Sequence, residues 1–486
     1  MATTSLATRG RPAAPLASFV PLASLLLAGA AGCPDRTISE LVPDQSGVEK
    51  KEIPVNIHRD LDLLFLIDKS PTMTDEQAAL TASFPRFIGV LRQIEGGLPN
   101  LHLGVISQDI GAGGMTVGGN CSGQGDNGNL LAAPRLPGCT PPNGNFISDL
   151  EGDAGGPRIT NYAGSLEDTF SCIATLGEHG CGFEQHLGSL KKALIGNPGN
   201  AGFLRPDAYL AIVIISDEDD CTAVNPRIYD PSAALVGELG AFADFRCFEW
   251  GWECDEGTLA RGPGQYSNCR PRMNSPYLSH PDAFVEDIKS LKADPEKIIV
   301  ATLVGPRPQD ASPPRPTSVT INTSGVPAVS PSCTNGDQSA FPMPRLHHFA
   351  QAFPGRNASY SLCNDDLSAG LVRVAELIRR VIGDPCFETD VDQTDLDPAN
   401  PGLQLQCTVA EVTDPGAPGE AETPLPPCTM ADPGTPAAGT PQPCWYVVPD
   451  PVKCEAYPTK LKLATFPEGR VLPSETRLRA QCTTRP

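Results

Sequence analysis

The chain has 486 residues, a net charge of −21 and an aromatic content of only 6%. This length allows two or three domains, and the 47 glycines and 51 prolines exclude a coiled coil or a long-helix protein. A field of negative sign repels phosphate backbones, so we expect no nucleic-acid partner.

Residues 1–32 have the composition of an export signal. Arg9 and Arg11 form a positive start, and a small apolar stretch follows that ends directly before Cys33. This stretch is too short and too interrupted by proline to span a membrane permanently. The segment resembles a bacterial lipoprotein signal, which implies that Cys33 is acylated and that the lipid anchors the chain to a membrane of the cell envelope. Ordinary secretion, with cleavage near residues 28–30, is the alternative.

Residues 33–57 are polar and are predicted to be a tether, followed by an ordered domain over residues 58–383. In this domain, apolar runs alternate with segments of helical periodicity. The runs predict buried strands at residues 61–67, 101–106, 209–215, 298–304 and 360–362. The periodic segments predict helices at residues 80–91, 184–195, 283–291 and 367–381. The alternation predicts an α/β fold with a doubly wound, mostly parallel sheet.

Three inserts interrupt this pattern, near residues 111–180, 221–280 and 306–344. Each follows a strand or precedes a helix, so the inserts are predicted to decorate the sheet edges. The alternation stops before residue 386, and residues 386–486 are rich in cysteine and proline. They predict a small β module that depends on disulfides, because its apolar content is low.

The 17 cysteines support an exported chain. If Cys33 carries lipid, an even number remains, and an even, scattered set in an exported protein predicts complete disulfide pairing. We expect Cys172 to pair with Cys181, and Cys121 with Cys139. A structural zinc site is not expected, because no Cys-x-x-Cys pair occurs and histidine is scarce.

A carboxylate and two hydroxyls follow the first buried strand at intervals of two residues, as Asp68, Ser70 and Thr72. Asp217 follows the strand predicted at residues 209–215. Because the carboxyl ends of parallel strands meet at one edge of a sheet, Asp68 and Asp217 are predicted to lie together. Oxygen ligands of this kind suit Mg²⁺ or Ca²⁺. The alternative is that the hydroxyls only cap the following helix.

At these residues the chain resembles the von Willebrand factor A (vWA) domain, over about residues 58–383. The metal-ion-dependent adhesion site (MIDAS) of that family uses an Asp-x-Ser-x-Ser/Thr loop, a threonine on a second loop, and an aspartate that ends a central strand. The Asp68 loop matches the first element and Asp217 the last, while Glu184 stands where the family has threonine. The resemblance implies a Rossmann-like fold and a divalent cation held by Asp68, Ser70, Thr72, Glu184 and Asp217. The whole pattern is most similar to the vWA lipoproteins of myxobacteria and their relatives.

This resemblance implies a non-enzymatic, adhesion-type protein of the cell envelope that binds a protein or extracellular matrix ligand through the ion. The alternative is a structural envelope component in which the ion only ties loops together. Glu184 bears on this choice, because three carboxylates neutralise a divalent ion and leave it a poorer acceptor for a partner's carboxylate. An enzyme is not expected, since the sequence has no nucleophile elbow, metalloprotease motif or phosphate loop.

Three further polar groups have plainer interpretations. The acidic residues 218–220 fit a solvated loop at least as well as a ligand set. The aspartates of residues 390–397 favour a solvated linker, because the run lacks the glycine and closing glutamate of an EF-hand. His347 and His348 are predicted to be a pair on a helix surface rather than a metal site.

Overall fold

The computed structural model describes residues 47–54, 59–94, 96–118, 120–121, 123–152, 156–336, 338–364, 366–415, 419–452, 454–455, 457–467 and 476–485. The predicted signal segment, Cys33 and the first part of the tether lie outside the described residues. Within the described ranges, no helix combines the length and the apolar character that crossing a membrane requires.

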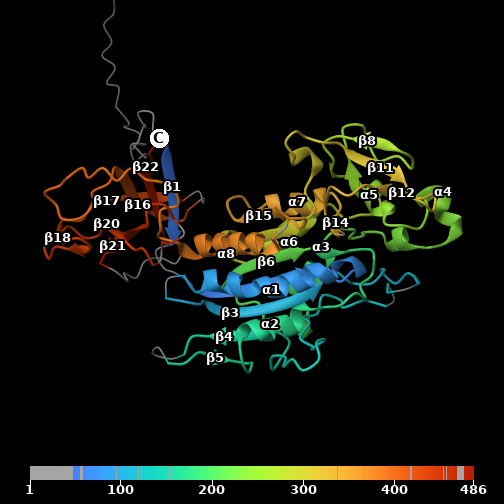
Figure 1. The fold of residues 1–486 in the computed structure, drawn as a ribbon, viewed down its shortest axis with the longest axis horizontal. Coiled ribbons are helices and arrows are strands. Elements are labelled where there is room, and N and C mark those ends of the chain that lie inside the picture. Colours follow the sequence, from blue (N-terminus) through green and yellow to red (C-terminus); the bar gives the residue numbers. More distant parts are fainter. Residues whose placement is uncertain are drawn as a thin grey trace, which may run out of the picture. The chain divides into compact units, whose positions relative to one another are not determined.

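A seven-stranded sheet forms the main core, in the order β15-β10-β6-β2-β3-β4-β5 (Figure 1). Its strands are β2 (Asp60–Ile67), β3 (Asn100–Ser107), β4 (Ile147–Leu150), β5 (Ile159–Thr160), β6 (Tyr209–Ile215), β10 (Ile298–Val304) and β15 (Asn357–Ser361). The five strands from β15 to β3 are parallel, whereas β4 and β5 pair antiparallel. The apolar runs predicted as strands are therefore confirmed as strands.

The predicted fold class, a doubly wound and mostly parallel sheet, is wrong for this chain. Across the described residues the strands fall into seven sheets, and the six outside the main core are all antiparallel. Many of their strands are only two or three residues long. The reason is that the inserts and the C-terminal segment are rich in glycine and proline, and tight reversals of the chain pair neighbouring segments antiparallel. The chain is a protein of mixed sheets.

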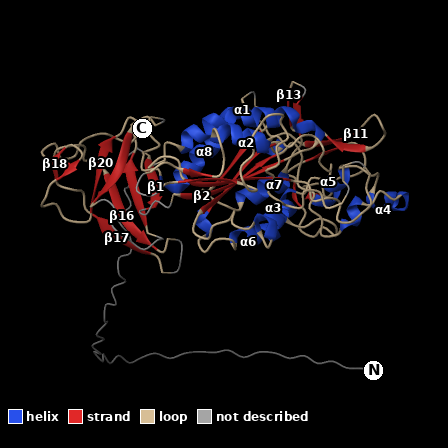
Figure 2. Cartoon of the chain, turned by 90° about the horizontal axis from the view of Figure 1, so that it is seen from below, coloured by secondary structure: helices blue, strands red, loops and turns tan. Residues whose placement is uncertain are grey.

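Helices cover both faces of the seven-stranded sheet (Figure 2). On one face lie α1 (Thr74–Leu91), α2 (Leu166–Ala174) and α8 (Leu367–Gly383), and on the other lie α3 (His186–Leu194), α6 (Pro281–Lys289) and α7 (Pro344–Gln351). Phe65 of β2 is fully buried and meets the ring of Phe87 on α1 edge-on, with the centroids 5.8 Å apart. Burial on both faces explains why this strand is a continuous apolar run.

The second and third inserts pack on each other as well as on the sheet. The second contains α4 (Val236–Leu239), α5 (Phe245–Gly251), β7 (Trp252–Glu253), β8 (Gly264–Tyr266) and β9 (Arg270–Pro271). The third contains β11 (Thr317–Ile321), β12 (Pro327–Val329), β13 (Cys333–Asn335) and β14 (Gln338–Ala340). Strand β11 pairs with both β12 and β8, so the two inserts share one sheet and one apolar cluster around Trp252.

A four-stranded antiparallel sheet of the order β1-β22-β16-β17 organises the C-terminal segment. Its strands are β1 (Val48–Pro54), β16 (Cys407–Thr413), β17 (Ala421–Leu425) and β22 (Arg477–Thr483). The hairpins beside it pair β18 (Met430–Asp432) with β19 (Thr435–Pro436), and β20 (Cys444–Pro449) with β21 (Leu461–Phe466). This segment has its own apolar cluster, which includes Ile53 of β1.

Strand β1 lies inside the range predicted to be a tether, and for Val48–Pro54 that prediction is wrong. This strand cannot be recognised from the sequence pattern, because two of its buried positions are occupied by charged residues. Glu49 accepts hydrogen bonds from the backbone N–H groups of Glu388 and Thr389, at 2.8 and 3.1 Å, and Lys51 pairs with Glu388 at 3.2 Å. The apolar alternation of a half-buried strand is therefore missing.

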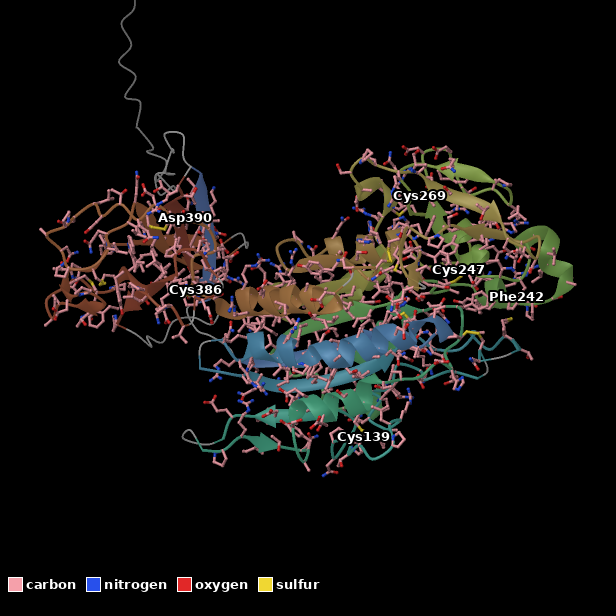
Figure 3. The ribbon with its side chains drawn as sticks, viewed as in Figure 1. Cys139, Phe242, Cys247, Cys269, Cys386 and Asp390 are labelled. Atoms are coloured by element: carbon pink, nitrogen blue, oxygen red, sulfur yellow. A yellow bond between two sulfur atoms is a disulfide. The ribbon has the colours of Figure 1, made fainter. Side chains whose placement is uncertain are left out.

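Eight disulfides join the cysteines of the described residues (Figure 3), which confirms the predicted complete pairing. The pairs are Cys121–Cys181, Cys139–Cys172, Cys221–Cys247, Cys254–Cys269, Cys333–Cys363, Cys386–Cys454, Cys407–Cys482 and Cys428–Cys444. Pairing of this density is typical of proteins that fold outside the cytosol.

Two predicted pairings, Cys172–Cys181 and Cys121–Cys139, are wrong although all four cysteines are bonded. Cys172 lies within α2 and meets Cys139, whereas Cys181 lies beyond the end of that helix and meets Cys121. The backbone of Gln185 bonds to that of Gln108, which brings the segment after Cys181 to the start of the first insert. The predicted pairings were based on closeness in the sequence, but the tertiary fold determines which loops come into contact.

Acid is expected to weaken the fold through His102 on β3. Its Nδ1 lies 2.8 Å from the carbonyl oxygen of Phe203, and burial lowers its pKa below the ordinary value. The unfolded chain takes up this proton near pH 6.5, so the stability that neutral His102 contributes is present above about pH 6.5 and is lost as the pH falls below that value. In urea titrations, His102→Gln should flatten the decline of the unfolding free energy between about pH 6.5 and 5. The exposed His179, changed to Gln, is the control; an equal decline in both variants would contradict the assignment.

Candidate metal centre

The ends of two neighbouring strands bring Asp68 and Asp217 to the same edge of the main sheet. Strands β2 and β6 are parallel with Ile67 opposite Ile215, and the N–H group of Asp68 donates to the carbonyl oxygen of Ile215 at 2.9 Å. Each aspartate follows the end of its strand, as the sequence predicts. This is the edge at which open sheets with parallel strands usually bind ligands.

Asp68 is fully buried and held from several sides. Its Oδ1 accepts hydrogen bonds from the backbone N–H of Ser70 and from Nε2 of Gln108, both at 2.7 Å, and its Oδ2 accepts from Oγ of Ser216 at 2.6 Å. Sequence reasoning missed Gln108, which directly follows β3. The strand-end rule that places Asp68 and Asp217 at this edge also applies to Gln108.

The two predicted hydroxyl ligands lie next to each other, with Ser70 Oγ 3.0 Å from Thr72 Oγ1. Ser70 is buried, whereas Thr72 is exposed. The side chain of Ser70 makes no capping hydrogen bond to the short helical turn that follows, and α1 begins after Met73 without a side-chain cap. The hydroxyls therefore do not serve as helix caps, the alternative considered for them.

Glu184 and Asp217 are each only 2% exposed, and each has one carboxylate oxygen, Oε1 and Oδ1 respectively, that is buried without a hydrogen-bond partner. Burial and the charge of Asp68 raise the pKa of Asp217 to about 7, against the effect of a hydrogen bond with Thr72. Burial, with the charges of Glu218 and Asp68, raises the pKa of Glu184 well above its ordinary value. An unpartnered carboxylate oxygen in such surroundings is costly.

Glu218 joins this cluster. Its side chain hydrogen-bonds to that of Glu184, and burial and the charge of Asp244 raise its pKa well above the ordinary value. The interpretation of residues 218–220 as a solvated loop is wrong, since Asp219 and Asp220 are buried. Charged residues next to one another in the sequence suggest exposure, but the inserts that cover this segment cannot be recognised from the local pattern. Asp219 accepts from Trp252 Nε1 at 2.8 Å and from the N–H groups of Arg345 and Leu346 at 3.1 Å.

Asp220 has a positioning role at the start of α3. It is buried, its Oδ1 accepts from the N–H group of Leu187 at 2.9 Å, and its Oδ2 pairs with Nη2 of Arg345 at 2.9 Å. Asp220 therefore joins the first turn of α3 to α7. Glu184 lies just ahead of this turn, so the ion pair of Asp220 and Arg345 helps to position the carboxylate of Glu184.

The carboxyl groups of the cluster have no paired cation in the part of the chain that the structure describes. Among the described side chains, no salt bridge reaches Asp68, Glu184 or Asp217, and Lys69 pairs instead with Asp109 and Asp126 at 3.2 and 2.6 Å. The donor set consists of carboxylate and hydroxyl oxygens, which are the ligands of hard divalent cations. The unpartnered oxygens of Glu184 and Asp217 and the chemistry of the donor set suit a Mg²⁺ or Ca²⁺ ion, but in this structure the carboxylate oxygens of Asp68, Glu184 and Asp217 do not all lie within 4.8 Å of one another, so an ion would have to draw them together.

The remaining polar groups have local roles. Asp392 and Asp395 accept from the N–H groups of Thr394 and Asp397, at 3.0 and 3.2 Å, as turn residues do. His347 is buried with Nε2 3.1 Å from the carbonyl oxygen of Gly305, so the prediction of a surface pair is wrong for this residue. Residue 348 faces away from residue 347 around the helix, and His348 is partly exposed.

No protein-family model matches the sequence, and no curated protein matches it, so the vWA resemblance stays a prediction. Solved structures with remote similarity include the pilus adhesin SpaC of Lactobacillus rhamnosus GG, with 12% identity and a TM-score of 0.28 over 90% of this chain and 41% of that chain. The pilus adhesin RrgA of Streptococcus pneumoniae has 12% identity and a TM-score of 0.27, over 90% and 58%. The type V pili tip protein Mfa5 of Porphyromonas gingivalis has 12% identity and a TM-score of 0.22, over 90% and 68%. The chain spans less than two thirds of the SpaC and RrgA chains.

Proposed function

We propose that the chain is an exported, non-enzymatic binding protein that holds Mg²⁺ or Ca²⁺ at the metal centre and engages a protein or extracellular matrix partner there. The observation that carries the proposal is the pair of buried, unpartnered oxygens on Glu184 and Asp217, beside the buried carboxylate of Asp68. The eight disulfides support the exported location.

A cation explains why this arrangement is tolerated. Charged carboxylates that are buried together repel one another, and each buried charge also loses its hydration. A divalent ion would offset both costs and order the strand-end loops, with the carboxylates supplying attraction and the hydroxyls of Ser70 and Thr72 adding no charge. Thr72 is exposed, so the centre is accessible to a partner from the side of this residue.

A structural role for the ion is the second candidate, and the burial of Glu184 favours it. A third carboxylate neutralises the ion and weakens its attraction for a partner's carboxylate. Both roles require the ion, but only the binding role requires a partner that depends on it.

Affinity capture with the immobilised full chain distinguishes the two roles. Extracts of surface proteins are applied in the presence of Mg²⁺ and Ca²⁺, with chelator, and with Asp68→Asn in place of the wild type. The binding role predicts a partner that is retained with the ions and lost in the other two conditions, and Glu184→Thr should strengthen its retention. Identical retention in all conditions, together with ion binding by calorimetry, would favour the structural role.

Lipid anchoring at Cys33 is part of the proposal, because the signal segment ends at this cysteine. Radiolabelled palmitate should enter the wild-type chain expressed in a bacterial host and should not enter Cys33→Ser. Membrane fractionation should show the variant released into the soluble fraction. Label that persists in Cys33→Ser would instead mean plain secretion with acylation elsewhere.

A further inference from the structure

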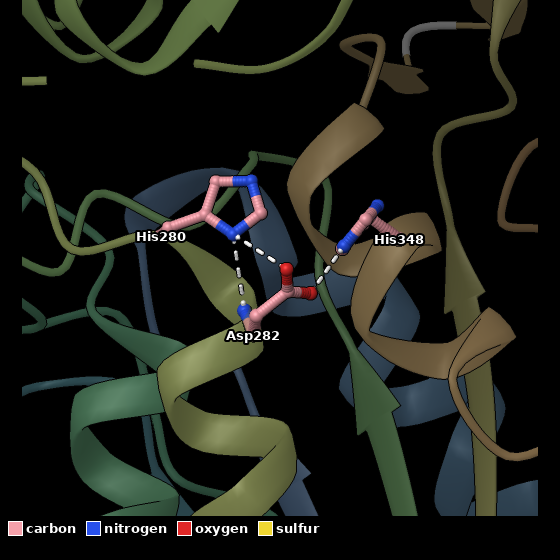
Figure 4. A group of neighbouring side chains, drawn as sticks. All are labelled: His280, Asp282 and His348. Carbon is pink, nitrogen blue, oxygen red and sulfur yellow. Dashed lines mark hydrogen bonds and ion pairs between the residues drawn. The ribbon is translucent and has the colours of Figure 1, made fainter. Parts of the chain in front are cut away.

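Two histidines and an aspartate meet outside the metal centre, where α6 and α7 pack against each other (Figure 4). His280 immediately precedes α6, Asp282 lies in its first turn, and His348 lies on α7. The carboxylate of Asp282 lies between the imidazoles, with Oδ1 2.6 Å from His348 Nε2 and Oδ2 3.2 Å from His280 Nδ1. One potential ligand atom from each residue lies within 4.8 Å of the other two.

This spacing is close to that of a transition-metal site. Zinc binds imidazole nitrogen and carboxylate oxygen at about 2.0–2.2 Å, which places the ligand atoms of a tetrahedral site about 3.3 Å apart. The three ligand atoms lie within 4.8 Å of one another, so a bound ion would draw them closer together. Nδ1 of His280 also accepts a hydrogen bond of 3.3 Å from the N–H group of Asp282, and metal binding would replace this long contact.

The ligand-bearing segments are anchored independently of any ion. Nη2 of Arg345 donates to the carbonyl oxygen of Ser279 at 2.6 Å, which ties the residue before His280 to α7. The N–H groups at the start of α7 bind Asp219. The site is therefore partly preorganised, which reduces the loss of conformational entropy on ion binding.

The three residues also differ in exposure in a way that suits an ion. The side chain of His280 is 12% exposed, whereas those of His348 and Asp282 are 39% and 56% exposed. Solvent thus reaches the cluster from one side, which gives an ion an entry path and leaves room for water as the fourth ligand.

We propose that His280, Asp282 and His348 form a second metal site, which binds a transition ion of the zinc class and joins the end of the second insert to α7. Imidazole ligands select Zn²⁺, Ni²⁺ or Cu²⁺ and not Mg²⁺ or Ca²⁺. The two sites therefore differ in the ions that they hold, and this one does not depend on the proposed binding function.

Titration calorimetry with ZnCl₂ on the disulfide-bonded full chain, stripped with chelator, tests the site. The titration uses the Asp68→Asn background, so that the oxygen-lined centre does not contribute. We expect one Zn²⁺ per chain, and His348→Ala should weaken binding by roughly tenfold or more. The exposed His179, changed to Ala, is the matched control and should bind as the background does.

Cobalt gives an independent readout. Co²⁺ held by these ligands in a tetrahedral site absorbs visible light, and His348→Gln should abolish this absorption while near-ultraviolet circular dichroism shows an unchanged fold. Absence of Zn²⁺ binding in the background chain, or equal binding by the His348→Ala and His179→Ala chains, would overturn the proposal. The three side chains would then be only a hydrogen-bonded His–Asp–His group.

Discussion

Mg²⁺ or Ca²⁺ is expected to raise the melting temperature of the wild-type chain and to leave that of Asp68→Asn unchanged. An ion at a hundredfold excess over its dissociation constant adds about 2.7 kcal/mol of stability. The amide oxygen of the substituted side chain can still accept from Ser70 and Gln108, so the substitution removes the charge while keeping the hydrogen bonds of Oδ1. Thermal melts with and without the ion, followed by circular dichroism, measure the difference.

Asp395→Asn is the matched control, because Asp395 belongs to the acidic run outside the cluster and accepts from the backbone N–H groups of Asp397 and Gln404. It should retain the full stabilisation by the ion. If the wild-type chain takes up no divalent ion at millimolar concentration in calorimetry, the metal centre does not exist. The raised pKa values of Glu184 and Asp217 would then mean that the cluster is held in its protonated form.

Arg345→Met is expected to destabilise the chain by about 3 kcal/mol, because it leaves the buried Asp220 without its ionic partner. Both side chains are completely buried, and Arg345 also bonds to the carbonyl of Ser279. The value lies at the lower end of the range for broken buried pairs, since Nε and Nη1 of Arg345 have no partner to lose. Urea denaturation measures the change in the free energy of unfolding.

Two further variants check the cause. Asp220→Asn combined with Arg345→Met removes both charges and should recover part of the loss, as expected for a buried pair. Arg270→Met breaks exposed pairs with Glu253 and Asp255 and should cost less than about 1 kcal/mol. A loss in Arg345→Met as small as that in Arg270→Met would mean that water reaches Asp220.

Part of the candidate site could be predicted from local pattern alone. Asp68 follows one buried strand, and Ser216 and Asp217 follow another. Because the strands are parallel, the geometry of strand ends is enough to place these residues at the same edge of the sheet. Glu184 came from the family resemblance. Gln108 directly follows β3, so the same strand-end rule could have found it, whereas the role of Glu218 depends on its contact with Glu184, which the tertiary structure brings to it.

The sequence by itself determined where the five parallel strands and the helices α1, α3, α6 and α8 lie, because continuous apolar runs and helical periodicity are local properties. It did not predict β4, β5 and α2, which lie inside the first insert. It also predicted that the sixteen cysteines other than Cys33 pair with one another, since their even number and an exported context are enough. Only the tertiary structure decided which cysteines meet, that β1 pairs with the distant β22, and that the six further sheets of the described residues are antiparallel. These contacts join segments that are far apart in the chain. They depend on the path of the connecting loops and on which surfaces pack together, and a local sequence pattern contains neither.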